Sequence, residues 1–169
     1  MNPEMLFHFI IALAGIVMIL AAASDAARYR IPNAACAALL LLFPLYIYAA
    51  PITIHWEKNL MVFAVTLVLG YLLFLKNWVG AGDIKFLSVT SLWAGPSFIA
   101  LLLTITAISG GLLALSLAGL AFVRHRLSHD ETPKPNLSQI PVPYGIAIAL
   151  GGLCTLALLL NPALLQAKG

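Results

Sequence analysis

Long apolar stretches joined by short polar segments account for most of this 169-residue sequence. Hydrophobic residues make up 62% of the chain and charged residues 9%, and the mean hydropathy is +1.01. Charged residues make up about a quarter of an ordinary soluble chain, which could not bury this much apolar surface. About twenty consecutive apolar residues cross a bilayer as a helix. The sequence therefore predicts an all-α, polytopic membrane protein.

The apolar stretches predict about six transmembrane helices in a single membrane domain that covers residues 1–169, with no room for a second, soluble domain. The approximate spans are 5–24, 34–50, 60–75, 78–95, 97–123 and 144–160. The polar segment 124–141 is predicted to be a cytoplasmic loop. The fourth span has two interpretations: its helix begins near Trp78 and carries Asp83 within the membrane, or it is a short helix capped by Asp83 at a water-filled mouth.

The distribution of Lys and Arg predicts how these helices are oriented. With six spans, one side of the membrane holds Arg28, Arg30, Lys76, Lys85, Arg124, Arg126 and Lys134, and the other holds Lys58 and Lys168. Cytoplasmic loops carry the excess of basic residues, so the first side is predicted to be cytoplasmic and both termini to lie outside. The first span is expected to be a retained helix rather than a signal peptide, because its basic residues follow it instead of preceding it.

Several classes of function are disfavoured by what the sequence contains. The net charge of +3 is small and scattered between apolar runs, so nucleic-acid binding is not expected. Cys36 and Cys154 lie in separate apolar runs, and the chain has no CxxC, HExxH, GxSxG or P-loop motif. We therefore expect no metal and no cofactor.

Two of the six acidic residues touch the predicted spans: Asp25 ends the first, and Asp83 lies in the fourth. An ionisable group at membrane depth costs about 2.5–3.5 kcal/mol even on lenient insertion scales, so each is a candidate functional residue. Each also has a structural interpretation: Asp25 could pair with Arg28 one helical turn on, and Asp83 could be a helix N-cap after the glycine turn of Gly80 and Gly82. Both aspartates are predicted to lie near the cytoplasmic face. If the two carboxyls converge, one would hold a proton while the other stays charged, which supplies the acid and the base of peptide hydrolysis.

The segment Gly80-Ala81-Gly82-Asp83 resembles the GxGD motif of membrane aspartic proteases. More specifically, the chain is similar to the type IV prepilin peptidase family, in the short form associated with Flp-type (Tad) pili. The resemblance rests on an ordered set of motifs and covers nearly the whole chain. An aspartate closing the first span is followed by Ile31-Pro32-Asn33, GAGDIK comes at the fourth span, and Pro143-Tyr144-Gly145 opens the sixth.

The resemblance implies an all-α GxGD protease with Asp25 and Asp83 as the catalytic pair. It implies motif or substrate-positioning roles for Gly80, Gly82, Lys85, Pro143, Tyr144, Gly145, Pro32 and Asn33. It also implies that the protein cuts the basic leader from prepilins and pseudopilins at the cytoplasmic edge of the bacterial inner membrane, just before the pilin's hydrophobic helix. Bifunctional relatives carry paired CxxC motifs in a further, zinc-binding cytoplasmic domain and also methylate the new N-terminus. This chain lacks those motifs, so no methyltransferase activity is expected.

Two alternatives remain open from the sequence. An archaeal-type preflagellin peptidase would share the fold and both aspartates. A non-enzymatic transporter would use the same two carboxyls to bind cations or to relay protons. Asparagine at either position would change transport in the second case and leave substrate processing unaffected.

Overall fold

The computed structural model describes residues 3–51, 53–127 and 141–161, and in these ranges the chain forms helices and no strands. The helices are α1 (Pro3–Arg28), α2 (Asn33–Ala49), α3 (Trp56–Leu75), α4 (Ala81–Leu127) and α5 (Tyr144–Leu159). This confirms the prediction of an all-α membrane protein. α1, α3 and α4 are each long and apolar enough to cross a membrane, whereas α2 and α5 are shorter apolar helices.

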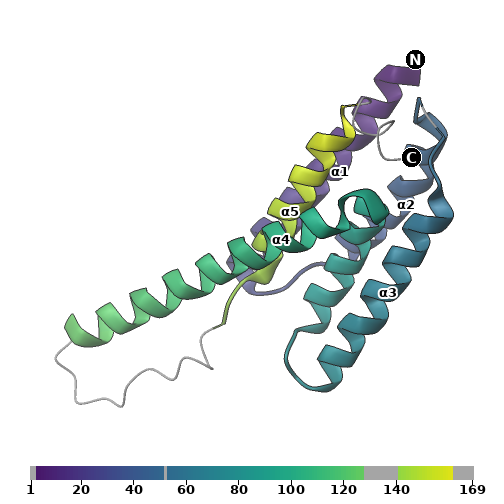
Figure 1. Ribbon diagram of the computed structural model, residues 1–169. Coiled ribbons are helices and arrows are strands. Elements are labelled where there is room, and N and C mark those ends of the chain that lie inside the picture. The colour runs from purple at the N-terminus through teal and green to yellow at the C-terminus, as the bar shows by residue number, and fades with distance from the viewer. Residues whose placement is uncertain (1–2, 52, 128–140, 162–169) are drawn as a thin grey trace.

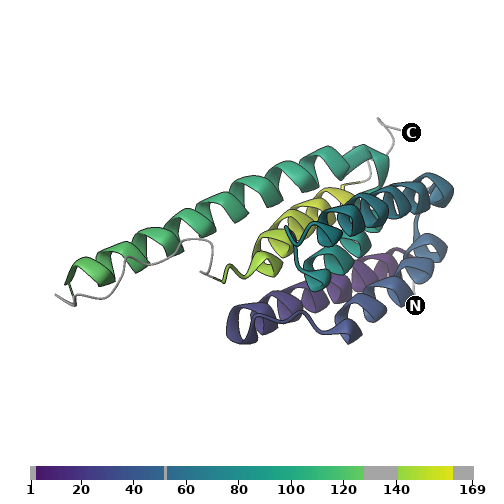
Figure 2. The same ribbon diagram turned by 90° about the horizontal axis from the view of Figure 1, so that it is seen from below.

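The helices run back and forth between two ends of an elongated bundle (Figure 1). α1 and α3 finish at the end where α4 and α5 begin. α5 packs against both α1 and α4, while α3 packs against α4 and α2 against α1. Figure 2 shows α5 lying between α1 and the distal half of α4, and that distal half runs out past the rest of the bundle. The packing places the C-terminus of α1 beside the N-terminus of α5, at the end of the bundle where α4 also begins.

A sharp break divides α4 into two arms. Gly95 has φ 55° and ψ −171°, a backbone conformation that glycine adopts without strain, and Pro96 follows it. Proline has no N–H, so the carbonyl of Leu92, four residues before Pro96, loses its helical donor. The side-chain Nδ2 of Asn59 in α3 donates to that carbonyl at 2.9 Å. The break is therefore a specific feature of the fold, and the side chain of Asn59 in the neighbouring helix stabilises it.

The hydrophobic core runs through the bundle, and its aromatic cluster lies at the end that holds this break. Trp93 is 1% exposed and its indole Nε1 donates to the Leu39 carbonyl at 3.3 Å. Its ring contacts those of Phe43 and Tyr46, with centroid separations of 5.8 and 5.2 Å. Phe7 stacks on Tyr46 at 5.6 Å. This aromatic cluster joins α1, α2 and α4 and fixes the geometry of the bundle at the end away from both aspartates.

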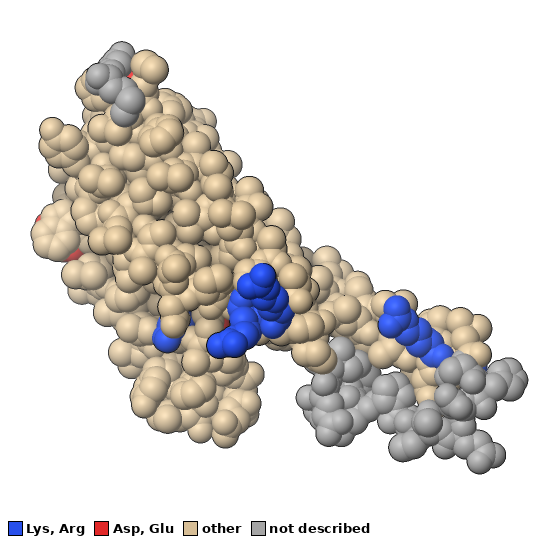
Figure 3. Space-filling view, turned by 180° about the vertical axis from the view of Figure 1, so that it is seen from behind, with Lys and Arg blue, Asp and Glu red and all other residues tan. Residues whose placement is uncertain are grey.

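The sequence placed two spans, 78–95 and 97–123, where the structure has the single kinked helix α4, and Gly95 marks their junction. α4 also continues to Leu127, four residues into the segment 124–141 predicted as a loop; residues 128–140 lie outside the described ranges. Three helices meet the length and composition expected of a span, so six crossings and their orientation stay predictions. On the face drawn in Figure 3, the visible blue Lys and Arg atoms lie in the half of the molecule away from the N-terminus.

Candidate active site

Asp25 lies in the last turn of α1 and is 4% exposed. Its Oδ2 accepts a hydrogen bond of 2.7 Å from the backbone N–H of Gly145, at the start of α5. Within the described ranges, Asp25 forms no ion pair with Arg28, which is exposed. The partner of this carboxylate is thus another helix, and the interpretation of Asp25 as a surface charge paired along its own helix does not hold in this structure.

The geometry at the start of α5 explains why Gly145 can take this role. The first N–H groups of a helix have no acceptor within the helix, and the helix dipole favours a negative charge there. Pro143, which is buried, precedes the helix and fixes the approach of the chain. A Cβ on Gly145 would lie 2.8 Å from Asp25 Oδ2 and 2.9 Å from its Cβ. Only glycine lets α5 approach the carboxylate this closely.

Asp83 is the third residue of α4 and is half-buried. The carbonyl of Gly80 accepts from the N–H of Ile84 at 3.2 Å, so Gly80, rather than Asp83, is the N-cap residue of this helix. The backbone N–H of Gly80 donates in turn to the Asp83 carboxylate. In a capping box, the side chain of the third helical residue accepts a hydrogen bond from the backbone N–H of the N-cap residue. Asp83 makes this bond with Gly80, in the place of the usual glutamate.

Both carboxyls lie at the end of the bundle where α1 ends and α4 and α5 begin. Gly145, which binds Asp25, directly follows Tyr144, which lines the same cavity as Asp83, so the two carboxyls lie on neighbouring parts of this end. Each carboxylate also accepts a hydrogen bond from a backbone N–H at a helix N-terminus. Such an arrangement can hold a pair of carboxyls that shares one proton.

The connection between α1 and α2 lies over the start of α4. A Cβ on Gly82 would be 3.8 Å from Cβ of Ile31, and Lys85 Nζ donates to Asn33 Oδ1 at 3.4 Å. Pro32 precedes α2 and is exposed. The structure therefore brings together the Ile-Pro-Asn segment and the GAGDIK segment, and Lys85 contacts Asn33 rather than either aspartate.

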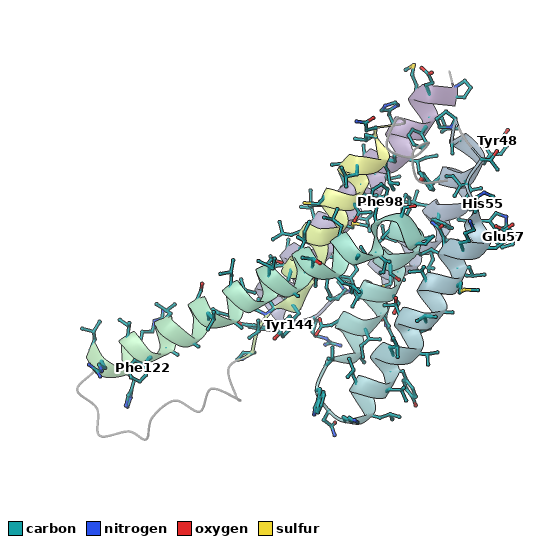
Figure 4. The ribbon with its side chains drawn as sticks, viewed as in Figure 1. Tyr48, His55, Glu57, Phe98, Phe122 and Tyr144 are labelled. Carbon is teal, nitrogen blue, oxygen red and sulfur yellow. The ribbon has the colours of Figure 1, made fainter. Side chains whose placement is uncertain are left out.

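Tyr144 lies at the opening of α5, where Figure 4 shows its side chain near the foot of the gap between the two arms of α4. Its ring packs against Gly110 of the distal arm, since a Cβ there would lie 3.2 Å from a ring carbon. Tyr144 is 43% exposed and lines, together with Asp83, a cavity of about 300 Å³. Gly145 of the Pro-Tyr-Gly segment thus binds Asp25, and Tyr144 of the same segment lines the cavity that Asp83 also lines.

Four features of the site could not be found by reasoning from the sequence. The bond between Asp25 and Gly145 joins positions 120 apart, and nothing local in either segment signals it. Gly110 lies in an apolar span, and nothing in the sequence around it indicates that Tyr144 packs against it. Trp78 and Thr106 join the cavity wall from separate elements. A buried hydroxyl without a hydrogen-bond partner among the described residues, that of Thr106, is visible in the structure alone.

Comparison with known proteins identifies the family. No curated protein and no solved structure matches the chain. A family model described as the type IV leader peptidase family matches residues 12–115, which include Asp25, the glycine motif and Asp83. The match covers more than half of the chain and contains both aspartates that the fold brings to one end of the bundle, so the protein belongs to the type IV leader peptidase family.

Proposed function

We propose that this protein is a membrane aspartic endopeptidase that removes the basic leader from prepilins of the Flp/Tad type. Membership of the type IV leader peptidase family supports a leader peptidase function in general. The observation that supports the two-aspartate mechanism is that Asp25 and Asp83 lie at the same end of the bundle. They are the two acids of the described helices that are buried or half-buried.

The proposed chemistry uses the carboxyl pair in its singly protonated form. The ionised carboxylate takes a proton from a water molecule, whose oxygen attacks the scissile carbonyl carbon, while the protonated carboxyl donates its proton to the carbonyl oxygen. The tetrahedral intermediate then collapses: one of its hydroxyls returns a proton to the ionised member of the pair as the C=O bond re-forms, the C–N bond breaks, and the leaving amine takes a proton from the other carboxyl. The pair is thereby restored to its singly protonated form. The backbone N–H groups of Gly145 and Gly80 hold the two carboxylates in place through these steps.

The glycines beside Asp83 support access of an extended substrate. Gly80 is exposed, and a Cβ placed on Gly82 would have its nearest neighbour, the Cβ of Ile31, at a van der Waals distance of 3.8 Å. Without side chains here, a substrate backbone can approach the carboxyl closely. The excess of Lys and Arg predicts that this end of the bundle faces the cytoplasm, which is the side where a leader that precedes a hydrophobic helix would wait.

The test is cleavage of a co-expressed prepilin, read as a gel shift, with the wild type, Asp25→Asn and Asp83→Asn. Asparagine keeps the size of the side chain and removes the carboxylate. A matched control is Glu57→Gln, which makes the same change at an exposed acid in the first turn of α3, at the end of the bundle away from Tyr144 (Figure 4).

We expect the wild type and Glu57→Gln to cleave and both aspartate variants, present at normal levels in the membrane, to accumulate the precursor. Cleavage by either aspartate variant would contradict the two-carboxyl mechanism. If the wild type cleaves none of several prepilins, and the Asn variants change ion or proton flux instead, the transporter alternative replaces the proposal.

A further inference from the structure

A second cavity lies beside the break in α4, at the end of the bundle away from both aspartates. It has a volume of about 90 Å³, and residues of α2, α3, α4 and α5 and of the segment before α3 line it. Figure 4 shows two residues of its wall, His55 and Phe98, at the far end of the bundle from Tyr144. This cavity and the one beside Asp83 have no residue in common.

The wall of this cavity is aromatic on one side and polar on the other. Trp93 and Tyr46 line it and are 1% and 2% exposed. Thr53, His55 and Lys58 line the polar side and are exposed. Among the described residues of the wall, Lys58 is the single permanently charged one and none is acidic. The cavity therefore offers a positive charge and hydrogen-bond donors at its open side.

Hydrogen bonds hold the turn that carries His55 and Lys58. The carbonyl of His55 accepts from the backbone N–H of Lys58 at 3.0 Å and from that of Asn59 at 3.4 Å. The side chain of Asn59 in turn donates to the Leu92 carbonyl at the break in α4. The backbone of this turn is thus fixed both to its own helix and to α4, so a ligand of the cavity need not order it on binding.

The chemistry and the size of the cavity fit a phosphate group. Lysine binds phosphate as a point charge, and the ring N–H of histidine and the hydroxyl of threonine are further donors to its oxygens. Pockets that bind whole small molecules begin at about 300 Å³. A space of about 90 Å³ instead holds a single compact group. One lysine also matches the single negative charge of a phosphodiester.

Exposed aromatic residues beside the cavity indicate its depth in the membrane. Tyr48, near the end of α2, is 85% exposed, and Trp56, at the start of α3, is 47% exposed. Tryptophan and tyrosine gather where the membrane meets water, at the level of the lipid headgroups. A cavity at this depth faces the phosphodiesters of the surrounding phospholipids.

We propose that this cavity binds a phosphate group, with Lys58 as its counter-charge and His55 and Thr53 as hydrogen-bond donors. The group can come from a phospholipid headgroup or from free phosphate in solution, and the depth of the cavity favours the headgroup. A bound phosphate contacts the start of α3 and the break in α4 together, so it stabilises the folded protein. The site does not depend on leader cleavage, because it shares no residue with the candidate active site.

The experiment measures the thermal unfolding of the full-length protein in a maltoside detergent, which contains no phosphate. A ligand that binds only the folded state raises Tm. Dioctanoyl phosphatidylethanolamine is the phospholipid probe, and dioctanoylglycerol, which has the same acyl chains and no phosphate, is the matched lipid. We expect the phospholipid to raise Tm by about 2–4 °C more than dioctanoylglycerol does. Inorganic phosphate, compared with sodium chloride at equal ionic strength, tests the free source.

Three lysine variants test the residues of the site. Lys58→Met removes the charge and is expected to abolish the difference between the two lipids, whereas Lys58→Arg keeps the charge and is expected to retain most of it. Lys76→Met is the matched control, because it removes an exposed lysine at the other end of α3, outside the cavity wall. It should leave the difference unchanged.

Each outcome decides the proposal. Equal shifts of Tm with the two lipids, together with no effect of inorganic phosphate, would overturn it, as would a shift that survives in Lys58→Met. A shift with inorganic phosphate alone that Lys58→Met abolishes supports the phosphate site and assigns it to the free ion. A shift with the phospholipid that Lys58→Met abolishes and Lys76→Met retains assigns it to the headgroup.

Discussion

The carboxylate of Asp25 binds the first turn of α5 through a 2.7 Å hydrogen bond from the backbone N–H of Gly145, 120 residues further along the chain. The contact does two things at once. It places a negative charge at a helix N-terminus, where the helix dipole and a free N–H stabilise it, and it fixes the position of a proposed catalytic group. α5 therefore supports the candidate active site although it carries no acid of its own in Tyr144–Leu159.

Gly145→Ala is predicted to reduce leader cleavage by about 10²-fold, because a misplacement of a catalytic group by about 1 Å has an effect of that size. The added Cβ would lie within 3.0 Å of three Asp25 atoms, so the carboxylate or α5 must shift. Initial cleavage rates of the purified variant check this. The control is Gly111→Ala, whose Cβ would meet nothing within 4 Å and which should cleave normally. Full activity of Gly145→Ala would show that the contact is not needed.

Asn59→Leu is predicted to lower the free energy of unfolding by about 1–3 kcal/mol, because it leaves the Leu92 carbonyl at the Pro96 break without its donor. Thermal unfolding of the protein in detergent measures the change. Thr104→Val serves as a comparison, since that exposed hydroxyl bonds only to a carbonyl of its own helix, Ala100, and its loss should change stability little. Equal stability of Asn59→Leu and the wild type would mean that the break does not depend on α3.

Leader cleavage is predicted to follow a bell-shaped pH profile. At low pH both carboxyls are protonated and no base is present; at high pH both are ionised and no acid is present, so the rate falls on either side of the singly protonated form. The two apparent pKa values of the profile belong to the pair rather than to either residue. The measurement is kcat/KM against pH in vesicles with both sides equilibrated. A rate that rises to a plateau with a single inflection would contradict a shared proton.

The contact between Lys85 and Asn33 is predicted to contribute less than about 1 kcal/mol, because it is exposed and its donor–acceptor distance of 3.4 Å is long. A double-mutant cycle with Lys85→Met and Asn33→Ala measures the coupling in the free energy of unfolding. Lys76→Met combined with Asn33→Ala is the reference pair, since Lys76 lies over the Trp78 ring. A coupling of 2 kcal/mol or more would show that this contact anchors the connection between α1 and α2.

Composition was enough to predict the fold class, because 9% charged residues leave a chain of this length few alternatives to membrane helices. The boundary between the predicted fourth and fifth spans also followed from the sequence, at the pair Gly95-Pro96. The direction of the second arm of α4 could not be predicted from the sequence. It depends on a φ of 55° and on a side chain from α3, and neither is visible in a hydropathy pattern.

The candidate site, too, could be predicted from the sequence only in part. Asp25 and Asp83 stand out in the sequence because acids are rare in apolar runs, and charge asymmetry predicted a common side. That Asp25 binds Gly145, and that Gly80 rather than Asp83 caps α4, required the packing of α5 and the backbone of the first turn. Contacts between segments far apart in the chain leave no local trace, so the cavity wall shared by Trp78, Asp83 and Tyr144 was beyond prediction from the residues.

The central claim is that Asp25 and Asp83 act as one catalytic unit. Its most direct test is the single-turnover cleavage rate of a prepilin by the purified protein in vesicles, compared for the wild type, Asp25→Asn, Asp83→Asn and the double variant. The account predicts that each single variant loses more than about 10³-fold and that the double variant is no slower than either, because groups that act together are not additive. Losses that are modest in each single variant and multiply in the double variant would contradict it.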